Sequence, residues 1–333
     1  MATIYEVSKL AGVSLATVSR VINNSGTVRP KTEQKVLSAI AELGYRPNSS
    51  AQSLASKKSN SVGVLIPELY GPFFGAMLSS IESELHKAGK RVIVTAGHSD
   101  ESTESDCINF LLGSNCDALI LHVYSVPDEL MEELNNGPIP IVLLNNHFPQ
   151  MAEKCIWLDN EDGGYIATKT LIEHGHRELA YISGPSWKID SFKRLAGHKR
   201  ALQEYGLEYN ENLTIEGNYE MASGKQAMHQ LLKQGIPFTG LLCANDEMAV
   251  GAMDVAREEG LKVPDDISII GYDNVSFANY LHPKLTSIGC QISDMGRMAA
   301  HMVLKNAYGK DNLQIQRIFK PHLVMRESVK RIN

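Results

Sequence analysis

The sequence predicts an α/β protein with a small helical domain at its N-terminal end and a body of two doubly wound parallel sheets. Three observations lead to this prediction. The first sixty residues carry the patterns of short helices. From Val62 onward, short apolar runs alternate with amphipathic helical patterns, as in parallel sheets covered by helices. This alternation restarts after about Asn160, which predicts a second unit of the same type.

Length and composition indicate a globular protein of two or three domains. The chain has 333 residues, of which 43% are hydrophobic and 21% are charged. We expect no membrane span and no signal peptide, because no run of about 18 apolar residues occurs and no charged segment precedes an apolar core. Five scattered cysteines without a Cys-x-x-Cys pair favour free thiols in a reducing cytoplasm.

Two short helices joined by a tight turn are predicted within residues 7–23. The inner face of the first helix is formed by residues at helical spacing: Val7, Leu10 and Ala11. Gly12 follows where the chain must turn sharply, and Ser14 is suited to cap the second helix. The inner face of that helix is formed by Val18, Val21 and Ile22. The pattern is typical of a helix-turn-helix that enters the DNA major groove.

A third helix is expected at residues 31–43, with Pro30 at its start and Gly44 at its end. Its inner face is formed by Val36, Ala39, Ile40 and Leu43. After an extended break, residues 48–58 form a segment of small residues whose one large apolar side chain is Leu54. Because a helix so short and so poor in apolar residues is marginal alone, we expect it to fold only against a partner.

The N-terminal segment is basic, whereas the rest of the chain is acidic. Residues 1–60 hold eight Lys and Arg and three Asp and Glu, a balance of +5 in a chain of formal net charge −6. The remainder therefore has a balance of −11. A basic head on an acidic body favours nucleic-acid phosphate contacts by the head alone. An ordinary three-helix cap with a solvated basic face is the alternative that these charges leave open.

The body is expected to contain two successive sets of strands and helices. In the first set, strands are predicted at residues 62–66, 92–96, 118–123 and 139–144, with a helix at residues 73–88. In the second set, strands are predicted at residues 179–183, 240–244 and 267–272, with helices at residues 167–174, 194–205 and 246–259. We expect the two units to face each other like jaws.

Several polar and aromatic residues follow the predicted strands. Ligand sites in doubly wound sheets lie beyond the carboxyl ends of the strands, which makes these residues candidates: Phe73, Asn145, Arg194, Asn245 and Asp273. An aromatic ring can stack on a sugar, while amides, a guanidinium and a carboxylate pair with its hydroxyls. The alternative is helix capping, which we expect for Asn160 and Asp246. Arg194 is expected to open a helix after the loop at residues 186–193.

A set of motifs runs through the whole chain. The head carries Val7-x-x-x-Ala11-Gly12-Val13-Ser14-x-x-Thr17-Val18-Ser19-Arg20-Val21-x-Asn23, followed by Gly44-Tyr45-x-Pro47-Asn48 and Ala51-x-Ser53-Leu54. The body carries Pro72-Phe73-Phe74, Arg194-Leu195-Ala196-Gly197 and Asn245-Asp246-x-x-Ala249-x-Gly251. With these motifs the chain resembles the LacI/GalR family of bacterial transcription regulators. Residues 73–77 look most similar to its galactose-repressor branch.

The resemblance implies how the head binds DNA. A recognition helix at about residues 15–23 would lie in the major groove of a palindromic double-stranded operator, where Arg20 can pair with guanine. Residues 51–56 would form a hinge helix in the minor groove, with Leu54 as a wedge between base steps. The implied DNA-binding residues are Ser14, Leu15, Ala16, Thr17, Ser19, Arg20, Asn23, Asn48, Ala51 and Leu54. The Arg that the family commonly has at the position of Gln52 is absent.

The resemblance further implies that a small sugar effector, bound between the two halves of the body, controls operator affinity allosterically. The implied effector-binding residues are Phe73, Asn145, Arg194, Tyr219, Asn245 and Asp273.

The expected domains are a helix-turn-helix domain (1–47), a hinge helix and linker (48–60) and an effector-binding and dimerisation body (61–333). Within the body, one subdomain is expected at about 61–160 and 291–320, and the other at about 161–290 and 321–330. Because no leucine-heptad extension follows the last motif, we expect a homodimer.

Two other classes of function fit the sequence less well. A secreted sugar-binding protein would account for the body and not for the basic head. An enzyme is disfavoured, because no G-x-G-x-x-G follows a strand and no Walker loop, G-x-S-x-G or H-E-x-x-H occurs. We therefore expect a cytoplasmic repressor of sugar-utilisation genes that binds no membrane and needs neither a cofactor nor a metal.

Overall fold

The computed structural model describes residues 2–22, 26–45, 58–146 and 148–332. The chain divides after Asn60 into two compact units, which we call the head and the body. Four of the predicted DNA-binding residues, Asn23, Asn48, Ala51 and Leu54, lie outside the described residues. The predicted hinge helix therefore stays a prediction.

The described residues of the head form three short helices: α1 (Ile4–Ala11), α2 (Leu15–Ile22) and α3 (Pro30–Glu42). They enclose a small core of five buried side chains: Val7, Ala11, Val18, Val36 and Ala39. The expected inward position of Leu10 is wrong, because its side chain is 47% exposed. The two buried residues of α1, Val7 and Ala11, are four positions apart and so lie on one face of the helix. Helices α2 and α3 pack against this face, which does not include Leu10.

The first half of the body is a parallel six-stranded sheet, which we call the N-subdomain sheet, with the order β11-β5-β4-β3-β1-β2. Its strands are β1 (Ser61–Ile66), β2 (Arg91–Ala96), β3 (Ala118–Leu121), β4 (Ile141–Leu144), β5 (Cys155–Leu158) and β11 (Ile318–Phe319). One face is covered by α5 (Pro72–Lys87) and α12 (Ile292–Tyr308), the other by α6 (Glu101–Gly113) and α7 (Asp128–Asn136). The predicted parallel, doubly wound unit is confirmed.

The second half, which we call the C-subdomain, has a sheet with the order β12-β10-β9-β8-β6-β7. Its strands are β6 (Leu179–Ser183), β7 (Thr214–Glu216), β8 (Gly240–Cys243), β9 (Ser268–Asp273), β10 (Thr286–Gly289) and β12 (His322–Val324). Only the β10–β12 pair of this sheet is antiparallel. Four helices cover it: α8 (Asn160–Glu173), α9 (Ile189–Glu204), α10 (Met221–Lys233) and α11 (Asp246–Glu258). Three short 3₁₀ helices complete the body: Pro149–Lys154, Glu211–Leu213 and Ser276–Asn279.

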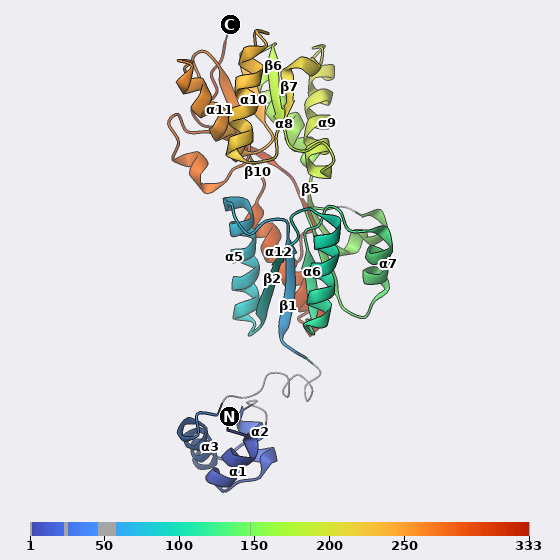
Figure 1. Cartoon of the computed structure of the whole chain (residues 1–333), viewed down its shortest axis with the longest axis vertical. Coiled ribbons are helices and arrows are strands. Elements are labelled where there is room, and N and C mark those ends of the chain that lie inside the picture. The colour runs from blue at the N-terminus through green and yellow to red at the C-terminus, as the bar shows by residue number, and fades with distance from the viewer. Residues whose placement is uncertain (1, 23–25, 46–57, 147, 333) are drawn as a thin grey trace. The chain divides into compact units, whose positions relative to one another are not determined.

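The chain passes between the two sheets of the body three times. It leaves the N-subdomain after β5, returns between β10 and α12, and leaves again between β11 and β12. These three segments run side by side between the two sheets in Figure 1. Each subdomain is therefore assembled from segments that are far apart in the sequence, and the two halves are joined at one edge of the space between them.

Two helices of the C-subdomain begin earlier than expected. Helix α8 begins at Asn160, seven residues before the predicted start, and α9 begins at Ile189. Arg194 therefore lies in the second turn of α9, and the expectation that it opens a helix is wrong. The apolar pattern missed these turns because α8 and α9 meet through glycines: a Cβ on Gly164 would lie 2.0 Å from the carbonyl oxygen of Arg194.

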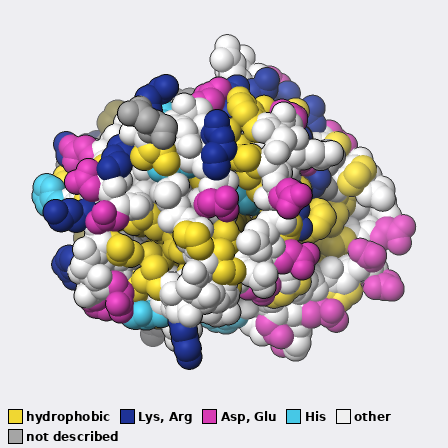
Figure 2. Space-filling view, turned by 90° about the horizontal axis from the view of Figure 1, so that it is seen from above, with side chains coloured by type: hydrophobic (Ala, Val, Ile, Leu, Met, Phe, Trp, Pro, Cys, Tyr) yellow, Lys and Arg dark blue, Asp and Glu magenta, His cyan; other side chains and the backbone are white. Residues whose placement is uncertain are grey.

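The surface of the body mixes charge types. On the face seen in Figure 2, acidic and basic side chains are interspersed, with apolar side chains between them. This face is therefore not a continuous basic surface of the kind that follows a DNA backbone. Within the described ranges, no helix combines the length and the apolar character that crossing a membrane requires.

Candidate functional site

The turn between the first two helices of the head is held by local hydrogen bonds. Thr3 and Glu6 form a capping box at the start of α1. Gly12 ends this helix in the left-handed region, with φ of 64°, where a residue with a Cβ is strained. Ser14 then accepts a hydrogen bond at 3.2 Å from the backbone N–H of Thr17. The predicted turn and cap are confirmed.

Helix α2 presents the predicted DNA-contacting side chains at the surface of the head. Val18 is fully buried, and Val21 and Ile22 pack against the core, so they anchor the inner face of the helix. The outer and flanking positions are exposed or partly exposed: Ser14, Leu15, Ala16, Thr17, Ser19 and Arg20. None of these six side chains belongs to the buried core of the head, as is expected of side chains that contact DNA.

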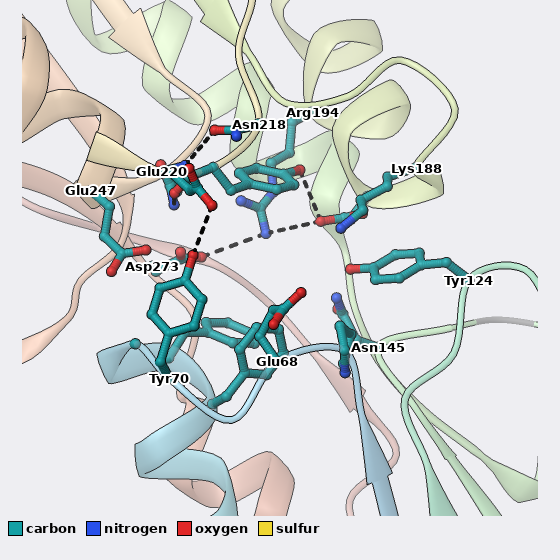
Figure 3. Close-up of a pocket in the computed structure, with 17 residues that line it drawn as sticks. Glu68, Tyr70, Tyr124, Asn145, Lys188, Arg194, Asn218, Glu220, Glu247 and Asp273 are labelled. Atoms are coloured by element: carbon teal, nitrogen blue, oxygen red, sulfur yellow. Dashed lines mark hydrogen bonds and ion pairs between the residues drawn. The ribbon is translucent and has the colours of Figure 1, made fainter. Parts of the chain in front are cut away.

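The body contains a cavity lined by residues of both subdomains. It is lined by all six residues that were predicted to bind an effector: Phe73, Asn145, Arg194, Tyr219, Asn245 and Asp273. Phe73 comes from the first turn of α5, and Asn145 directly follows β4. The other four come from α9 and from the ends of strands in the C-subdomain. Figure 3 shows Asn145, Arg194 and Asp273 around this cavity.

The backbone at this cavity adopts conformations that side chains normally avoid. Asn145, Tyr219 and Asp273 have φ of 55°, 75° and 100°. Positive φ is unfavourable for residues with a Cβ, most of all for a bulky aromatic residue such as Tyr219. Such strain persists only where surrounding contacts hold it, and it is concentrated at ligand sites. The strained positions therefore support the assignment of this cavity as the binding site.

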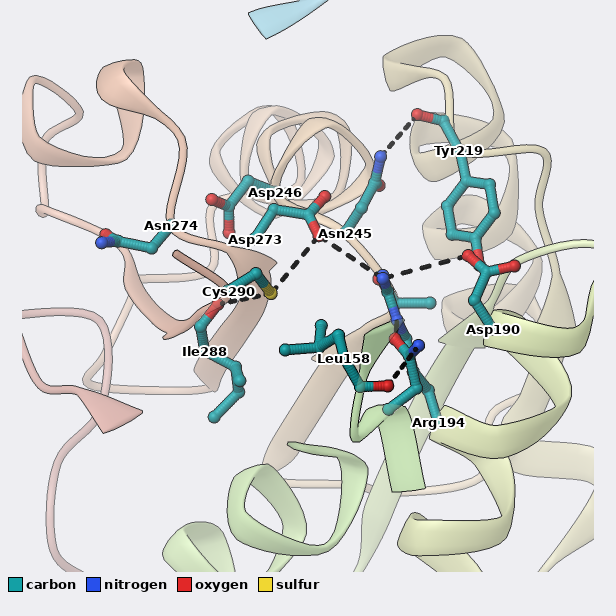
Figure 4. A network of polar contacts seen from close by, with 12 residues as sticks. Leu158, Asp190, Arg194, Tyr219, Asn245, Asp246, Asp273, Asn274, Ile288 and Cys290 are labelled. Atoms are coloured by element: carbon teal, nitrogen blue, oxygen red, sulfur yellow. Dashed lines mark hydrogen bonds and ion pairs between the residues drawn. The ribbon is translucent and has the colours of Figure 1, made fainter. Parts of the chain in front are cut away.

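Arg194 is the centre of a buried polar network in the C-subdomain (Figure 4). Its side chain is 3% exposed, and its Nε donates to Asn160 Oδ1 at 2.9 Å. Its Nη1 donates to the carbonyl oxygen of Ala244. Its Nη2 lies 3.5 Å from Asp273 Oδ1 and 3.9 Å from Asp190 Oδ2.

The network around Arg194 extends to the strained tyrosine. The hydroxyl of Tyr219 donates to Asp190 Oδ2 at 2.9 Å. The backbone oxygen of Tyr219 accepts from Asn245 Nδ2 at 2.8 Å. The guanidinium of Arg194 also stacks on Tyr272, 3.8 Å from the centre of the ring. A charged group so thoroughly buried must be paired and hydrogen-bonded, and here it is.

Asn245 forms two hydrogen bonds within the C-subdomain and also lines the cavity. Its Oδ1 accepts from the backbone N–H of Met248 at 2.9 Å, so it caps α11, as the capping alternative proposed. Its Nδ2 holds Tyr219 in place through the bond already described. An amide carries two N–H donors and two lone pairs, so one donor and one lone pair of Asn245 are left for a ligand.

The expectation that Asn160 and Asp246 cap helices is wrong. The cap of α8 is Asp159, and Asn160 instead binds Arg194 and the carbonyl oxygen of Leu158. Asp246 accepts from the backbone N–H of Val275 at 2.8 Å and from the hydroxyl of Ser287 at 2.6 Å. Burial raises the pKa of Asp246 to about 7, while these hydrogen bonds act in the opposite direction. Both residues are buried supports behind the cavity wall.

Nine further polar or aromatic residues line the cavity that were not predicted to bind an effector: Glu68, Tyr70, Phe74, Tyr124, Lys188, Asp190, Asn218, Glu220 and Glu247. The rule that ligands bind beyond strand ends applies to Glu68 and Tyr70, which follow β1, and to Tyr124, which follows β3. Lys188 and Asp190 were missed because the start of α9 was placed too late. Nothing in the sequence alone indicates that Glu220 and Glu247 share one cavity.

Lys188 lies in an aromatic corner of the cavity. Its ammonium nitrogen is 4.6 Å from the centre of the Tyr124 ring, 5.3 Å from that of Trp187 and 5.8 Å from that of Tyr219. Burial lowers the pKa of Lys188 below its usual value. The rings supply the electron-rich faces that a desolvated ammonium prefers. The three rings, together with the nearby carboxylates Asp190 and Glu68, therefore stabilise this positive charge.

Metal chemistry finds no support at this site. Within the part of the chain that the structure describes, no group of three or more His, Cys, Asp and Glu side chains is arranged to hold a metal ion. The cavity offers instead carboxylates, amides, hydroxyls and aromatic faces. Those groups bind a polar organic molecule by hydrogen bonds and stacking.

Two family models match separate parts of the chain. Residues 3–48 match the model of bacterial regulatory proteins of the lacI family, and residues 168–329 match that of a periplasmic binding protein-like domain. The HTH-type transcriptional regulator GalR of Escherichia coli strain K12 is 38% identical over 329 residues, covering 99% of this chain and 96% of its own length.

Two solved structures resemble the chain over nearly its whole length. A lac repressor dimer bound to operator and the anti-inducer ONPF has a TM-score of 0.86 and 30% identity, covering 99% of both chains. A complex of the transcriptional regulator CelR with cellobiose has a TM-score of 0.72 and 31% identity, covering 98% of this chain and all of the other. The chain therefore belongs to the lacI family of bacterial regulatory proteins.

Proposed function

We propose that this chain is a repressor of sugar-utilisation genes that binds a palindromic operator as a homodimer and whose operator affinity is controlled by a small sugar bound in the body cavity. Membership of the lacI family makes it a DNA-binding transcription regulator and not an enzyme. Its relatives include the transcriptional regulator GalR and a transcriptional regulator, CelR, whose structure was solved in complex with cellobiose. Such a regulator acts where the DNA is, in the bacterial cytoplasm.

One observation carries the proposal for the effector. Six residues chosen from sequence, spread over 200 positions from Phe73 to Asp273, line a single cavity between the two subdomains. The cavity offers the aromatic side chains Phe73 and Tyr219 together with hydrogen-bonding groups of both kinds. A sugar presents apolar C–H faces and hydroxyl groups that donate and accept, so it needs this combination.

The position of the cavity supports allosteric control. A ligand that contacts both subdomains stabilises the arrangement of the two halves that fits it best, and so it shifts the population between arrangements. Because three segments join the two subdomains, a change in the angle between the subdomains moves the N-subdomain as a rigid unit. In a dimer, that movement would alter the spacing of the two segments at 48–60 that connect to the heads.

The DNA-binding part is tested with a mobility-shift assay on duplexes from the chain's own genomic locus. We expect a complex that weakens steeply as salt rises, since basic side chains would displace counterions from the phosphates. Arg20→Ala removes the long donor of α2 and is expected to weaken specific binding about tenfold or more. Arg257→Ala, which removes the same charge from an exposed site of the body, is the matched control. Equal effects of both substitutions would refute a recognition role for Arg20.

The effector part is tested by thermal-shift screening against sugars and sugar derivatives. A ligand of the native protein raises the melting temperature in a concentration-dependent way. The sugar that stabilises the protein is then added to the mobility-shift assay, where we expect it to change operator affinity. If no sugar changes either the melting temperature or the complex, the proposed sugar control is wrong, whereas the DNA-binding proposal stands.

A further inference from the structure

The charges that line the effector cavity are strongly unbalanced. The lining holds five carboxylates: Glu68, Asp190, Glu220, Glu247 and Asp273. It holds two cationic side chains, Arg194 and Lys188. Arg194 is paired with Asp190 and Asp273, and Lys188 lies among three aromatic rings and is attracted by Asp190 and Glu68, so the carboxylates of the lining outnumber its cations by three. Negative charge is therefore what the cavity has left to offer a ligand.

The unmatched negative charge is concentrated at one end of the cavity. Figure 3 shows Glu220, Glu247 and Tyr70 together on the side opposite to Lys188 and Tyr124. The Tyr70 hydroxyl donates to Glu220 Oε1 at 3.1 Å and so holds this carboxylate at the cavity. Glu247 is half-buried in the first turn of α11 and accepts no side-chain or backbone hydrogen bond from the described residues. Burial and the neighbouring Glu220 both raise the pKa of Glu247.

A second, independent group in the cavity also lacks a donor. Asp190 is 4% exposed, and its Oδ1 has no hydrogen-bond partner among the described residues. Its other oxygen is engaged by Tyr219. An unpaired buried carboxylate oxygen costs free energy, so a donor supplied by a ligand would relieve it. A hydroxyl or an N–H group of the ligand meets this need, whereas an anionic group does not.

We propose that the effector is an amino sugar, a polyhydroxylated ring whose ammonium group binds between Glu247 and Glu220. This inference rests on the proposed sugar effector and narrows its chemical class. The ring hydroxyls then meet Asn145, Asp190 and the Arg194–Asp273 pair, and Phe73 contacts the apolar face of the ring. The ammonium supplies three donors and the positive charge that the Glu220–Glu247 end of the cavity lacks.

The same charges exclude a sugar phosphate as the effector. A phosphate group carries close to two negative charges at neutral pH. It would enter a cavity lined by five carboxylates and two cations, so the net negative charge of the lining repels it. A neutral sugar meets no such repulsion, but it leaves Glu247 unmatched. The order of affinity follows directly: amino sugar, then neutral sugar, then sugar phosphate.

Isothermal titration calorimetry of the full chain tests this order with four kinds of probe. The probes are D-glucosamine and D-galactosamine, their N-acetyl derivatives, the parent hexoses and the hexose 6-phosphates. We expect one of the two amines to bind at least tenfold more tightly than its N-acetyl derivative and its parent hexose, with the phosphates weakest. N-acetylation removes the charge and keeps the ring, so this pair isolates the contribution of the ammonium.

Glu247→Gln keeps the shape of the side chain and removes its charge, so it is expected to abolish the tenfold preference for the amine. Glu208→Gln, a substitution at an exposed position away from the cavity, is the matched control and should keep that preference. The inference is overturned if a parent hexose binds as tightly as its amine, or if Glu247→Gln leaves the preference unchanged; sugar control of DNA binding then still stands. If none of the four kinds of probe binds, the amino sugar and the sugar effector are both refuted.

Discussion

The two walls of the effector cavity are built in different ways. The wall from the C-subdomain is a network of buried, mutually bonded polar groups centred on Arg194. The wall from the N-subdomain presents partly exposed aromatic residues, Phe73 and Tyr124, with Asn145 as its buried polar group. The first wall is a part of the core of its subdomain, whereas the second is mostly a surface. Substitutions in the C-subdomain wall should therefore change both the stability of the protein and its affinity for the effector. Substitutions in the N-subdomain wall should change chiefly the affinity for the effector.

The largest expected effect comes from removing the guanidinium. Arg194→Met removes the cation from the buried ion pairs with Asp190 and Asp273 and removes the donor to Asn160 Oδ1. We expect a loss of roughly 3–5 kcal/mol in the free energy of unfolding, measured by urea denaturation. Phe73→Leu, in the opposite wall, should cost less than about 1.5 kcal/mol while still weakening effector binding. Equal losses in the two variants would contradict the distinction between the walls.

Filling the contact between α8 and α9 tests how rigidly the polar wall is held. A Cβ at Gly197 would lie 1.9 Å from the carbonyl oxygen of Glu161, so Gly197→Ala must push the two helices apart. We expect a loss of about 3 kcal/mol in the free energy of unfolding. The control is Gly75→Ala in α5 of the N-subdomain, where nothing lies within 4 Å of the added methyl group.

Gly75→Ala should stabilise the protein by about 0.5–1 kcal/mol, because alanine is the better helix former. A neutral Gly197→Ala would show that α8 and α9 can separate without cost. The proposed rigidity of the polar wall would then be wrong.

Each subdomain contains a buried histidine whose contribution to stability should be lost in acid, His122 in the N-subdomain and His198 in the C-subdomain; His176 of the C-subdomain is also buried and has a lowered pKa. Burial lowers the pKa of His122 in the N-subdomain to about 4 and that of His198 in α9 to about 3. Asp190 opposes this shift at His122, while Lys188 adds to it, and Lys199 adds to it at His198. At these two histidines the folded state binds fewer protons than the unfolded state, so their contribution to stability falls as the pH drops below about 6.5. Asp246, whose pKa burial raises to about 7, contributes in the opposite direction over the same pH range.

His122 and His198 should each account for a loss on the order of 2 kcal/mol between pH 7 and pH 5, measured by urea denaturation at each pH. His198→Phe should remove the contribution of His198, so between pH 7 and pH 5 the unsubstituted protein should lose about 2 kcal/mol more stability than this variant, whatever the substitution does to the stability at pH 7. An unchanged pH dependence in His198→Phe would contradict a neutral buried imidazole at this position.

The smallest expected effect distinguishes helix capping from ligand contact. Asn245→Ala removes the cap of α11 and should cost about 1 kcal/mol of stability. Asp100→Ala removes the equivalent cap of α6 in the N-subdomain and should cost a similar amount. Only Asn245→Ala should also lower effector affinity, as measured by calorimetry. If the two variants bind the effector equally well, Asn245 is a cap and no more.

The amino-acid sequence predicted the parallel sheets and their order along the chain well, because buried strands are short apolar runs and helices have amphipathic periods. The six residues predicted to bind an effector line one cavity: five were predicted because ligand sites lie beyond the carboxyl ends of parallel strands, and Tyr219 was predicted from the family resemblance alone. The first turns of α8 and α9 were not found, because they pack through glycines and leave Ile189 exposed. The roles of Asn160 and Asp246 could not be predicted, since their partners Arg194 and Ser287 lie 34 and 41 residues away.

The contact between Gly164 and the backbone of Arg194 has a consequence for redesigning the regulator. A Cβ at residue 164 would lie 2.0 Å from the carbonyl oxygen of Arg194. The close packing of α8 and α9, and with it the position of Arg194 in the cavity wall, therefore depends on glycine at residue 164. A designer who wants a new inducer should keep this helix pair as a fixed scaffold. Amino-acid substitutions should instead be made in the loops that carry Glu68, Tyr70 and Glu220, where variants are expected to keep the fold.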